Sequence, residues 1–249
     1  MPVVGNTLKL GDYVTYEGEP YVVLYDMDSS YNWIEIVSEN PLESVTLGTD
    51  DPTSAASGTS DPYIRAKWSY NNAISTLNTI AQNYLNTDLA DRARCIGSNP
   101  ENPLSEGAIR SYDKVKAIDT NYQTDYTQLN SINASSFSDN NYEYYWLASR
   151  GWVLDTNGRA SLNSFYGIRR ADISGNVKDL GLNDCTLGSL LVTYEMDYES
   201  LDEYQREENS DLFKYKSATA GFRPVIKLKN SVKVVRGNGT KTSPYILQK

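Results

Sequence analysis

A proline lies inside the strongest strand-like stretch of this 249-residue chain, Ser217–Lys229. The apolar and β-branched residues of the stretch are Phe222, Val225, Ile226 and Leu228. Proline cannot donate a hydrogen bond to a neighbouring strand, so strands that contain it lie at a sheet edge or carry a bulge. The sequence therefore predicts an edge strand, or a bulge near Pro224. This strand is expected to close the domain and to lead into a terminal hairpin with its turn at Gly237–Gly239.

The length and the pattern of elements favour one α+β domain. A chain of 249 residues can bury a sizeable core, and β-rich domains of this size are common. We expect a single domain over 1–249. Strands and a loop fill residues 1–59, a helical half spans 60–139, and a half made of a sheet and long loops spans 140–249.

The first forty residues show hairpin chemistry. Leu8–Ser38 is expected to form three short strands, with a turn at Glu17–Pro20 between the first two. The next residues, 39–59, contain Pro41, Pro52 and a run of small residues, so they are expected to form a surface loop.

Three segments in the middle of the chain are predicted to be wholly or partly helical. Ser60 or Asp61 can cap a helix that has Pro62 in its first turn. Its apolar stripe is Ala73, Ile74, Leu77, Ile80, Ala81, Tyr84 and Leu85. Asp88–Gly97 is predicted to be a second, short helix that ends at Gly97. Asp119–Asp139 is polar and is expected to be a long loop with some helix.

Strand signals return after Asn140. Tyr144–Ser149 is predicted to be a strand that Trp152–Leu154 continues or pairs with. Ser164–Ile173 is predicted to be another strand, and a turn then leads into Val177. Alternation along the first of these strands would place Tyr144 and Trp146 on one face and the residues between and after them on the other.

Aromatic residues supply the candidate contact positions. Tyrosine combines a large apolar face with a hydroxyl group, so it suits surfaces that remain wet, although β-sheets also favour it. The candidate ligand contacts are Tyr142, Tyr144, Trp152, Tyr166, Tyr194 and Tyr198. The expected scaffold residues are Trp146, Gly221, Phe222, Arg223 and Pro224. Arg223 is expected to be a buried hydrogen-bond donor.

The negative net charge and the lack of histidine disfavour or exclude several kinds of partner and catalytic mechanism. The net charge of −9 disfavours nucleic acid as a partner, and the absence of histidine excludes Ser-His-Asp and Cys-His catalysis. Calcium could be held by carboxylates, but the spacing of an EF-hand is absent, so we expect no cofactor and no metal. The carboxylates considered for calcium are Asp50, Asp51, Asp197, Glu199, Asp202, Glu203, Glu207, Glu208 and Asp211. A pair of carboxylates could also hydrolyse glycosides, if they lie in one cleft.

The two cysteines, Cys95 and Cys185, leave two alternatives open. They could form one disulfide that closes a long loop, as is common outside the cell. They could also be two buried, reduced thiols. We slightly favour the pair.

Three motifs occur together in the second half of the chain: YWLASR at Tyr145–Arg150, FYGIRRADISGNV at Phe165–Val177, and GFRPVIKL at Gly221–Leu228 followed by RGNGTKTSPYIL. The combination resembles bacterial and phage modules of the C-type-lectin-fold superfamily, in the branch related to formylglycine-generating-enzyme folds and to the variable proteins of diversity-generating retroelements. The resemblance implies an irregular antiparallel sheet closed by the C-terminal strands, adjacent first and last strands, and long projecting loops that bind proteins or glycans.

Two activities of that superfamily do not carry over. The triplets of calcium-dependent sugar binding are missing, and Cys95 and Cys185 do not match the reactive cysteine pair of the copper-dependent oxidases. The resemblance therefore implies a non-enzymatic module for adhesion or display, extracellular on a pilus, a cell surface or a phage virion. Its contacts are expected between Asn121 and Asn141 and between Leu180 and Ser217.

Two alternatives stay open. One is a structural protein, such as a decoration, fibre or pilus subunit that mainly contacts its own assembly. The other, less favoured, is a carboxylate-dependent glycan hydrolase. The first residues lack the basic start and apolar run of a signal peptide, and no apolar run of about 18 residues could cross a membrane. We expect either export without such a signal, as in a phage particle, or a leader upstream of this sequence.

Overall fold

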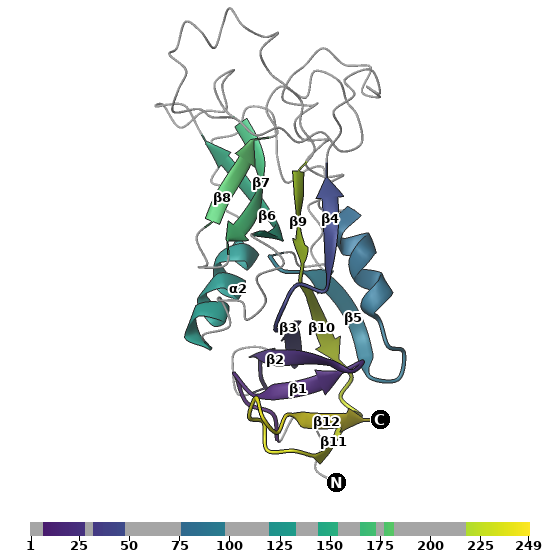
Figure 1. Cartoon of the computed structure of the whole chain (residues 1–249). Helices are drawn as coiled ribbons and strands as arrows, with labels where there is room; N and C mark the ends of the chain where they lie inside the picture. Colours follow the sequence, from purple (N-terminus) through teal and green to yellow (C-terminus); the bar gives the residue numbers. More distant parts are fainter. Residues whose placement is uncertain are drawn as a thin grey trace, which may run out of the picture.

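The computed structural model describes residues 7–27, 32–47, 76–97, 120–132, 144–153, 165–172, 177–181 and 218–249. This part of the chain is a strand-rich α+β structure with two sheets, one of seven strands and one of five (Figure 1). Most neighbouring strands are antiparallel. The α+β class predicted from the sequence is confirmed.

The seven-stranded sheet gathers strands from both ends of the chain and from its middle. In spatial order its strands are β11 (Lys233–Arg236), β12 (Tyr245–Gln248), β1 (Tyr13–Tyr16), β2 (Glu19–Tyr25), β3 (Glu35–Ser38), β10 (Pro224–Leu228) and β5 (Ala90–Cys95). Strands β1 and β12 are parallel neighbours. The first three strands and the terminal hairpin therefore form as the sequence predicts, and the first and last strands pair.

The turn between β1 and β2 is tighter than the predicted one. Tyr16 lies opposite Glu19, so only Glu17 and Gly18 connect the strands. Both have positive φ, 53° and 88°, which is the backbone of the two-residue turns that match strand twist. Glu19 and Pro20 belong to β2 rather than to the turn.

The five-stranded sheet has the order β4 (Glu43–Leu47), β9 (Ala218–Phe222), β6 (Tyr144–Val153), β7 (Phe165–Asp172) and β8 (Val177–Gly181). The continuous β6, together with β7 and β8, confirms the strands predicted after Asn140. Strand β4 corrects the loop expected over 39–59. Its burial alternates, with Val45 and Leu47 buried and Ser44 and Thr46 exposed, but this pattern is only five residues long and follows a proline.

The predicted short helix over Asp88–Gly97 is wrong, because Ala90–Cys95 forms strand β5. Strand β5 pairs along its length with β10, and its side chains divide between the two faces of the sheet. Ala93 and Cys95 enter the core, while Arg94 is buried among ionised partners. These tertiary contacts outweigh the helix propensity of alanine and arginine.

Pro224 does not lie in an edge strand. It is the first residue of β10, which is flanked on both sides by β3 and β5. The predicted strand is instead two strands, since β9 ends at Phe222 and the chain passes from one sheet to the other at Arg223. Proline is tolerated at the first position of a strand, which explains how it fits an interior strand. The register shift in β10 lies at Lys227 and Leu228, away from the proline.

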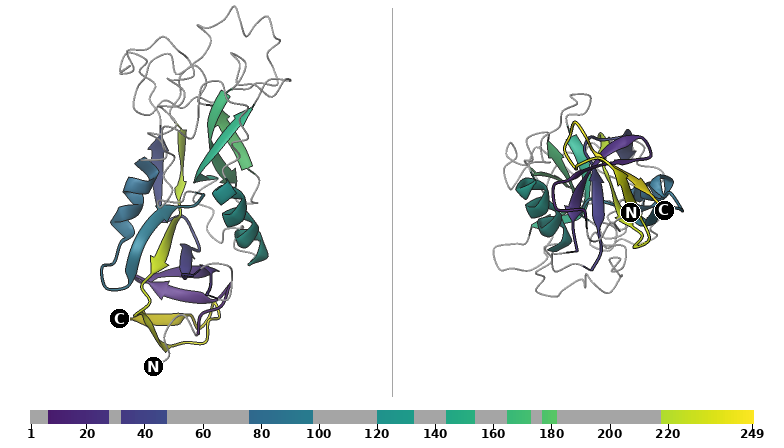
Figure 2. Two further views of the ribbon diagram at one scale, coloured as in Figure 1. Left: turned by 180° about the vertical axis from the view of Figure 1, so that it is seen from behind. Right: turned by 90° about the horizontal axis from the view of Figure 1, so that it is seen from below.

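Two helical segments lie on opposite sides of the sheets (Figure 2). Residues 76–81 are helical and continue into the 3-10 turn η3 (Gln82–Tyr84), and Leu77 and Ala81 of the predicted stripe are fully buried. On the other side, α2 (Thr120–Ser131) replaces much of the loop expected over 119–139. Its sequence is too polar to show an apolar stripe.

Buried side chains form two clusters. The larger, the main core, includes Val14, Ile36, Trp146 and Phe222. The smaller one, the α2-side cluster, includes Tyr145, Leu147 and Leu129 of α2. Strand β6 thus sends alternate residues to different clusters, as its predicted alternation requires.

Candidate functional site

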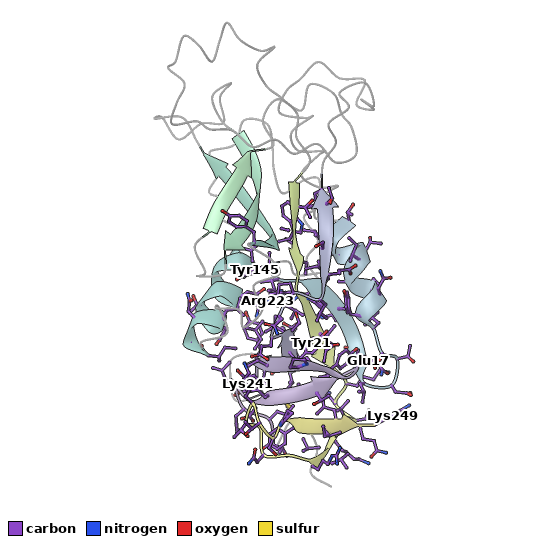
Figure 3. The ribbon with its side chains drawn as sticks, in the orientation of Figure 1. Glu17, Tyr21, Tyr145, Arg223, Lys241 and Lys249 are labelled. Carbon is purple, nitrogen blue, oxygen red and sulfur yellow. The ribbon has the colours of Figure 1, made fainter. Side chains whose placement is uncertain are left out.

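The junction between the two sheets is built around Arg223. Its side chain is fully buried, and Nε and Nη2 donate to the carbonyl oxygens of Ser38 and Glu39 at 3.0 and 3.2 Å. Its guanidinium carbon lies 5.0 Å from the ring centroid of Tyr145, and Figure 3 shows both residues where the sheets meet. Burial lowers the pKa of Arg223, while Tyr145 and Glu39 act in the opposite direction. Arg223 is thus the buried donor expected from the sequence.

A cluster of buried ionised groups ties α2 to the seven-stranded sheet. Arg94 Nη1 lies 2.6 Å from Asp125 Oδ2, and its Nη2 lies 2.8 Å from Glu35 Oε2. The Tyr25 hydroxyl and the Gly97 backbone N–H also donate to Asp125, each at 2.6 Å. Burial would lower the pKa of Arg94, but the two carboxylates outweigh it and hold that pKa well above its usual value.

This cluster does not have the properties of a hydrolytic site. Glycoside hydrolysis needs two carboxyl groups that flank a substrate in a cleft. Glu35 and Asp125 are the carboxylates that Arg94 brings together, and the side chain of each is only 3% exposed. Both accept hydrogen bonds from Arg94, so the arrangement is one of structural ion pairs.

A second charged group lies on the neighbouring strands around Trp33, which sequence reasoning missed as a site. Arg92 and Lys227 are direct neighbours on β5 and β10, and each cationic group lies 5.4 Å from the Trp33 ring centroid. Lys227 Nζ also lies 3.2 Å from Asp91 Oδ2, and Arg92 Nη2 lies 3.7 Å from Glu35 Oε1. The two cations are therefore matched by two carboxylates within the group.

Only three of the six aromatic residues predicted to contact a ligand lie within the described residues. Tyr144 is half-buried and packs against the main core, so it does not extend freely into solvent. Trp152 and Tyr166 are direct partners in the register of β6 and β7. Tyr142, Tyr194 and Tyr198 lie outside the described residues.

The scaffold residue Trp146 is fully buried and donates from Nε1 to the carbonyl oxygen of Val45 at 2.8 Å. Because Trp146 lies on β6 and Val45 on β4, this bond spans the five-stranded sheet. Phe222 and Pro224 are also buried, and Gly221 pairs with both Ser44 and Tyr145. These positions hold the two sheets together.

Cys95 is a free thiol in the structure and is fully buried. Its Sγ lies 3.6 Å from the carbonyl oxygen of Trp146, and burial raises its pKa to about 12. In this structure Cys95 therefore has the form of the buried, reduced thiol, the second of the two alternatives. Cys185 lies outside the described residues.

Within the described ranges, no group of three or more carboxylate or cysteine side chains could hold a metal ion. The carboxylates considered for calcium, from Asp50 to Asp211, all lie outside those ranges. No helix of the described part of the chain is long and apolar enough to span a membrane.

The ends of two long segments meet the scaffold at neighbouring residues. Leu47, the last residue of β4, is the register partner of Ala218, the first residue of β9. Next to them, the hydroxyl oxygens of Thr46 and Thr219 are 2.7 Å apart on the exposed surface. The residue before 48–75 and the residue after 182–217 therefore lie side by side at one place, the Leu47–Ala218 end, which is turned away from β11 and β12 (Figure 1).

Two contact regions are expected from the sequence, and the structure of the first, between Asn121 and Asn141, differs from the expected loop. Residues 120–131 are the helix α2, and buried Asp125 and Leu129 attach it to the sheet and the α2-side cluster. The second region, between Leu180 and Ser217, lies outside the described residues except for Leu180 and Gly181. No protein-family model, no curated protein and no solved structure matches the chain.

Proposed function

We propose that this chain is a non-enzymatic binding module with a C-type-lectin-like fold, carried outside the cell on a phage particle or a bacterial surface appendage. Its contacts with a protein or a glycan come from segments attached at the Leu47–Ala218 end. The observation that carries the proposal is the register of β4 and β9, which brings the start of one long segment beside the end of another at Leu47 and Ala218. The paired first and last strands lie away from the Leu47–Ala218 end (Figure 1), so attachment to a carrier at those strands would leave that end uncovered.

The composition of residues 182–217 supports a role in contact. This segment contains nine acidic and three basic residues, so its formal charge of −6 is most of the net −9 of the chain. It also contains the tyrosines at 194, 198, 204 and 215. Tyrosine is enriched at surfaces that bind a partner, and charged residues suit the polar, solvent-accessible rim of such a surface.

A replacement of residues 183–216 by a short glycine–serine linker tests the proposal. The linker joins β8 to β9 and leaves every described strand in place. The intact chain is expected to bind on an array of bacterial and host glycans or to intact cells, and the linker variant is expected to lose that binding. Val235→Ser, an exposed change on β11, is the matched control and should bind as the intact chain does.

Circular dichroism first establishes that the linker variant keeps its strands. A folded linker variant that binds as well as the intact chain would contradict the proposed location of the site. An intact chain that binds neither the glycans nor the cells would contradict the ligand-binding role itself.

A structural subunit of a particle or fibre is the second candidate. The parallel pair of first and last strands favours it, because such a domain can be built into a longer assembly through one side of its scaffold. Sedimentation of the purified chain distinguishes the candidates. Concentration-dependent assembly without glycan or cell binding supports the subunit, while a strict monomer that binds supports the module.

A further inference from the structure

The first and last strands of the described chain form one parallel pair. Val14 lies opposite Tyr245, and Thr15 lies opposite Ile246. Each strand also has an antiparallel neighbour on its other side, β2 for β1 and β11 for β12. Because the two strands run in the same direction, the chain enters β1 at one end of the pair and leaves β12 at the other.

This arrangement fixes how a pulling force acts on the domain. Hydrogen bonds between strands lie across the strand direction. A force applied between the two chain ends therefore acts along β1 and β12 and loads all of their mutual bonds together. If the strands were peeled apart from one end, the same bonds would break one after another under a lower force.

We propose that the β1–β12 pair is a mechanical clamp, which lets this domain carry tension between its two chain ends without unfolding. Resistance to a pulling force does not require a bound ligand, so the clamp does not depend on the proposed binding function. It applies equally to a module in a tethered stalk and to a subunit in a fibre.

Contacts beside the pair reinforce it. The backbone N–H of Tyr13 donates to the carbonyl oxygen of Gly239 at 2.8 Å, which attaches the start of β1 to the loop before β12. Lys241 in that loop places its Nζ 2.5 Å from Glu39 Oε1 and 5.9 Å from the Tyr13 ring centroid. Sliding β12 past β1 must break these contacts as well.

The pair is also held by burial. Val14 is fully buried and Leu247 is 8% exposed, and both belong to the main core. Removing β12 along its own axis would therefore expose apolar surface at the same step that breaks the backbone bonds. Both costs are concentrated in the transition state for forced unfolding, which determines the unfolding rate under load.

Single-molecule pulling in two directions tests the clamp. In the first, handles are fused to the two ends of the chain, so that β1 and β12 are sheared. In the second, one handle stays at the C-terminal end and the other is attached to a thiol at position 19, in Glu19→Cys with Cys185→Ser. Residue 19 is exposed and lies opposite Tyr16 at the far end of β1, so this pull peels the strands. Because Cys95 is fully buried, the handle should attach only to the thiol at position 19.

At equal loading rate, the distribution of unfolding forces should shift to higher force for the end-to-end direction than for the peeling direction. The end-to-end pull is repeated on the doubly substituted chain, so that both directions use the same protein. Equal forces, or a lower force end to end, would overturn the clamp. The experiment measures unfolding force and not binding. Its outcome is therefore independent of whether the chain binds a glycan or a cell.

Discussion

Arg223 Nε donates a 3.0 Å hydrogen bond to the carbonyl oxygen of Ser38, the residue that ends β3. Arg223 itself lies at the break between β9 and β10, where the chain leaves one sheet for the other. One guanidinium group therefore fixes the backbone at two of the crossings between the sheets, from β9 to β10 and from β3 to β4, since it also binds the carbonyl oxygen of Glu39 on the way to β4.

Arg223→Met should destabilise the domain by about 2–4 kcal/mol, because it leaves two buried carbonyl oxygens without their donor. Arg223→Lys should recover little, since an ammonium group lacks the planar fork that reaches both oxygens. The midpoint of urea unfolding measures the change. Arg236→Met, on the exposed part of β11, is the control and should change stability by less than about 0.5 kcal/mol. A loss as small for Arg223→Met would contradict the role given to this residue.

Arg94→Met should cost about 3–5 kcal/mol, because the buried carboxylate of Asp125 then loses its ion-pair partner and, among the described residues, Glu35 keeps only the Arg92 contact at 3.7 Å. Adding Glu35→Gln and Asp125→Asn removes the unpaired charges and should recover part of the loss. Urea unfolding measures the stability of the single variant and of the triple variant. A triple variant less stable than Arg94→Met would show that the charges are not the source of the cost.

Sequence patterns predicted best the elements whose contacts are local. The β1–β2 and β11–β12 hairpins have turn residues between short apolar runs, and the alternation of β6 correctly separated Trp146 from Tyr145. In each case the residues that determine the structure are close together in the sequence.

The errors share one physical cause, which is contact between distant residues. Strand β5 carries helix-forming residues, but Arg94 pairs with Glu35 and Asp125, 59 and 31 positions away. The same ion pair anchors α2, whose sequence has no apolar stripe. Asn78 and Gln82 also bond the backbone of β5, which covers its edge with a helix. A single sequence does not show which charges will meet.

The candidate contact residues divide in the same way. Trp146 was predictable as a scaffold residue because a strand surrounded by loops buries its largest side chain, and the structure buries it fully. Tyr144 was predicted to be a contact, but it packs against the main core. The attachment of two long segments at Leu47 and Ala218 was not predictable, because β4 was taken for a loop.

Gly237→Ala and Gly18→Ala should differ sharply although both glycines have positive φ, 99° and 88°. An added Cβ at Gly237 would collide with the backbone of Pro244, whereas at Gly18 it would meet no atom within 4 Å. Gly18→Ala should therefore cost only the backbone strain, about 1 kcal/mol, and Gly237→Ala should cost clearly more. Thermal unfolding of the two variants measures the difference. Equal losses would mean that the hairpin loop adapts without cost.

Stability should fall as the solution becomes alkaline, because Cys95, Tyr16 and Tyr21 are buried and burial raises the pKa of each. Burial raises the pKa of Cys95 from 9.0 to about 12 and is the largest cause of a rise at Tyr16 from 10.0 to about 12. The unfolded chain loses these protons first, so the stabilisation is complete below about pH 9 and is lost as the pH rises towards 12. Urea midpoints measured across this range should decline steadily.

Cys95→Ala provides the matched test of that decline. The substitution lowers stability at every pH by removing buried volume, but it should make the alkaline decline shallower, because one of the titrating groups is removed while the buried tyrosines remain. Thiol labelling in a Cys185→Ser background gives an independent reading, since Cys95 should react only when the chain unfolds. An unchanged alkaline slope in Cys95→Ala, together with rapid labelling of the folded chain, would place this thiol outside the core.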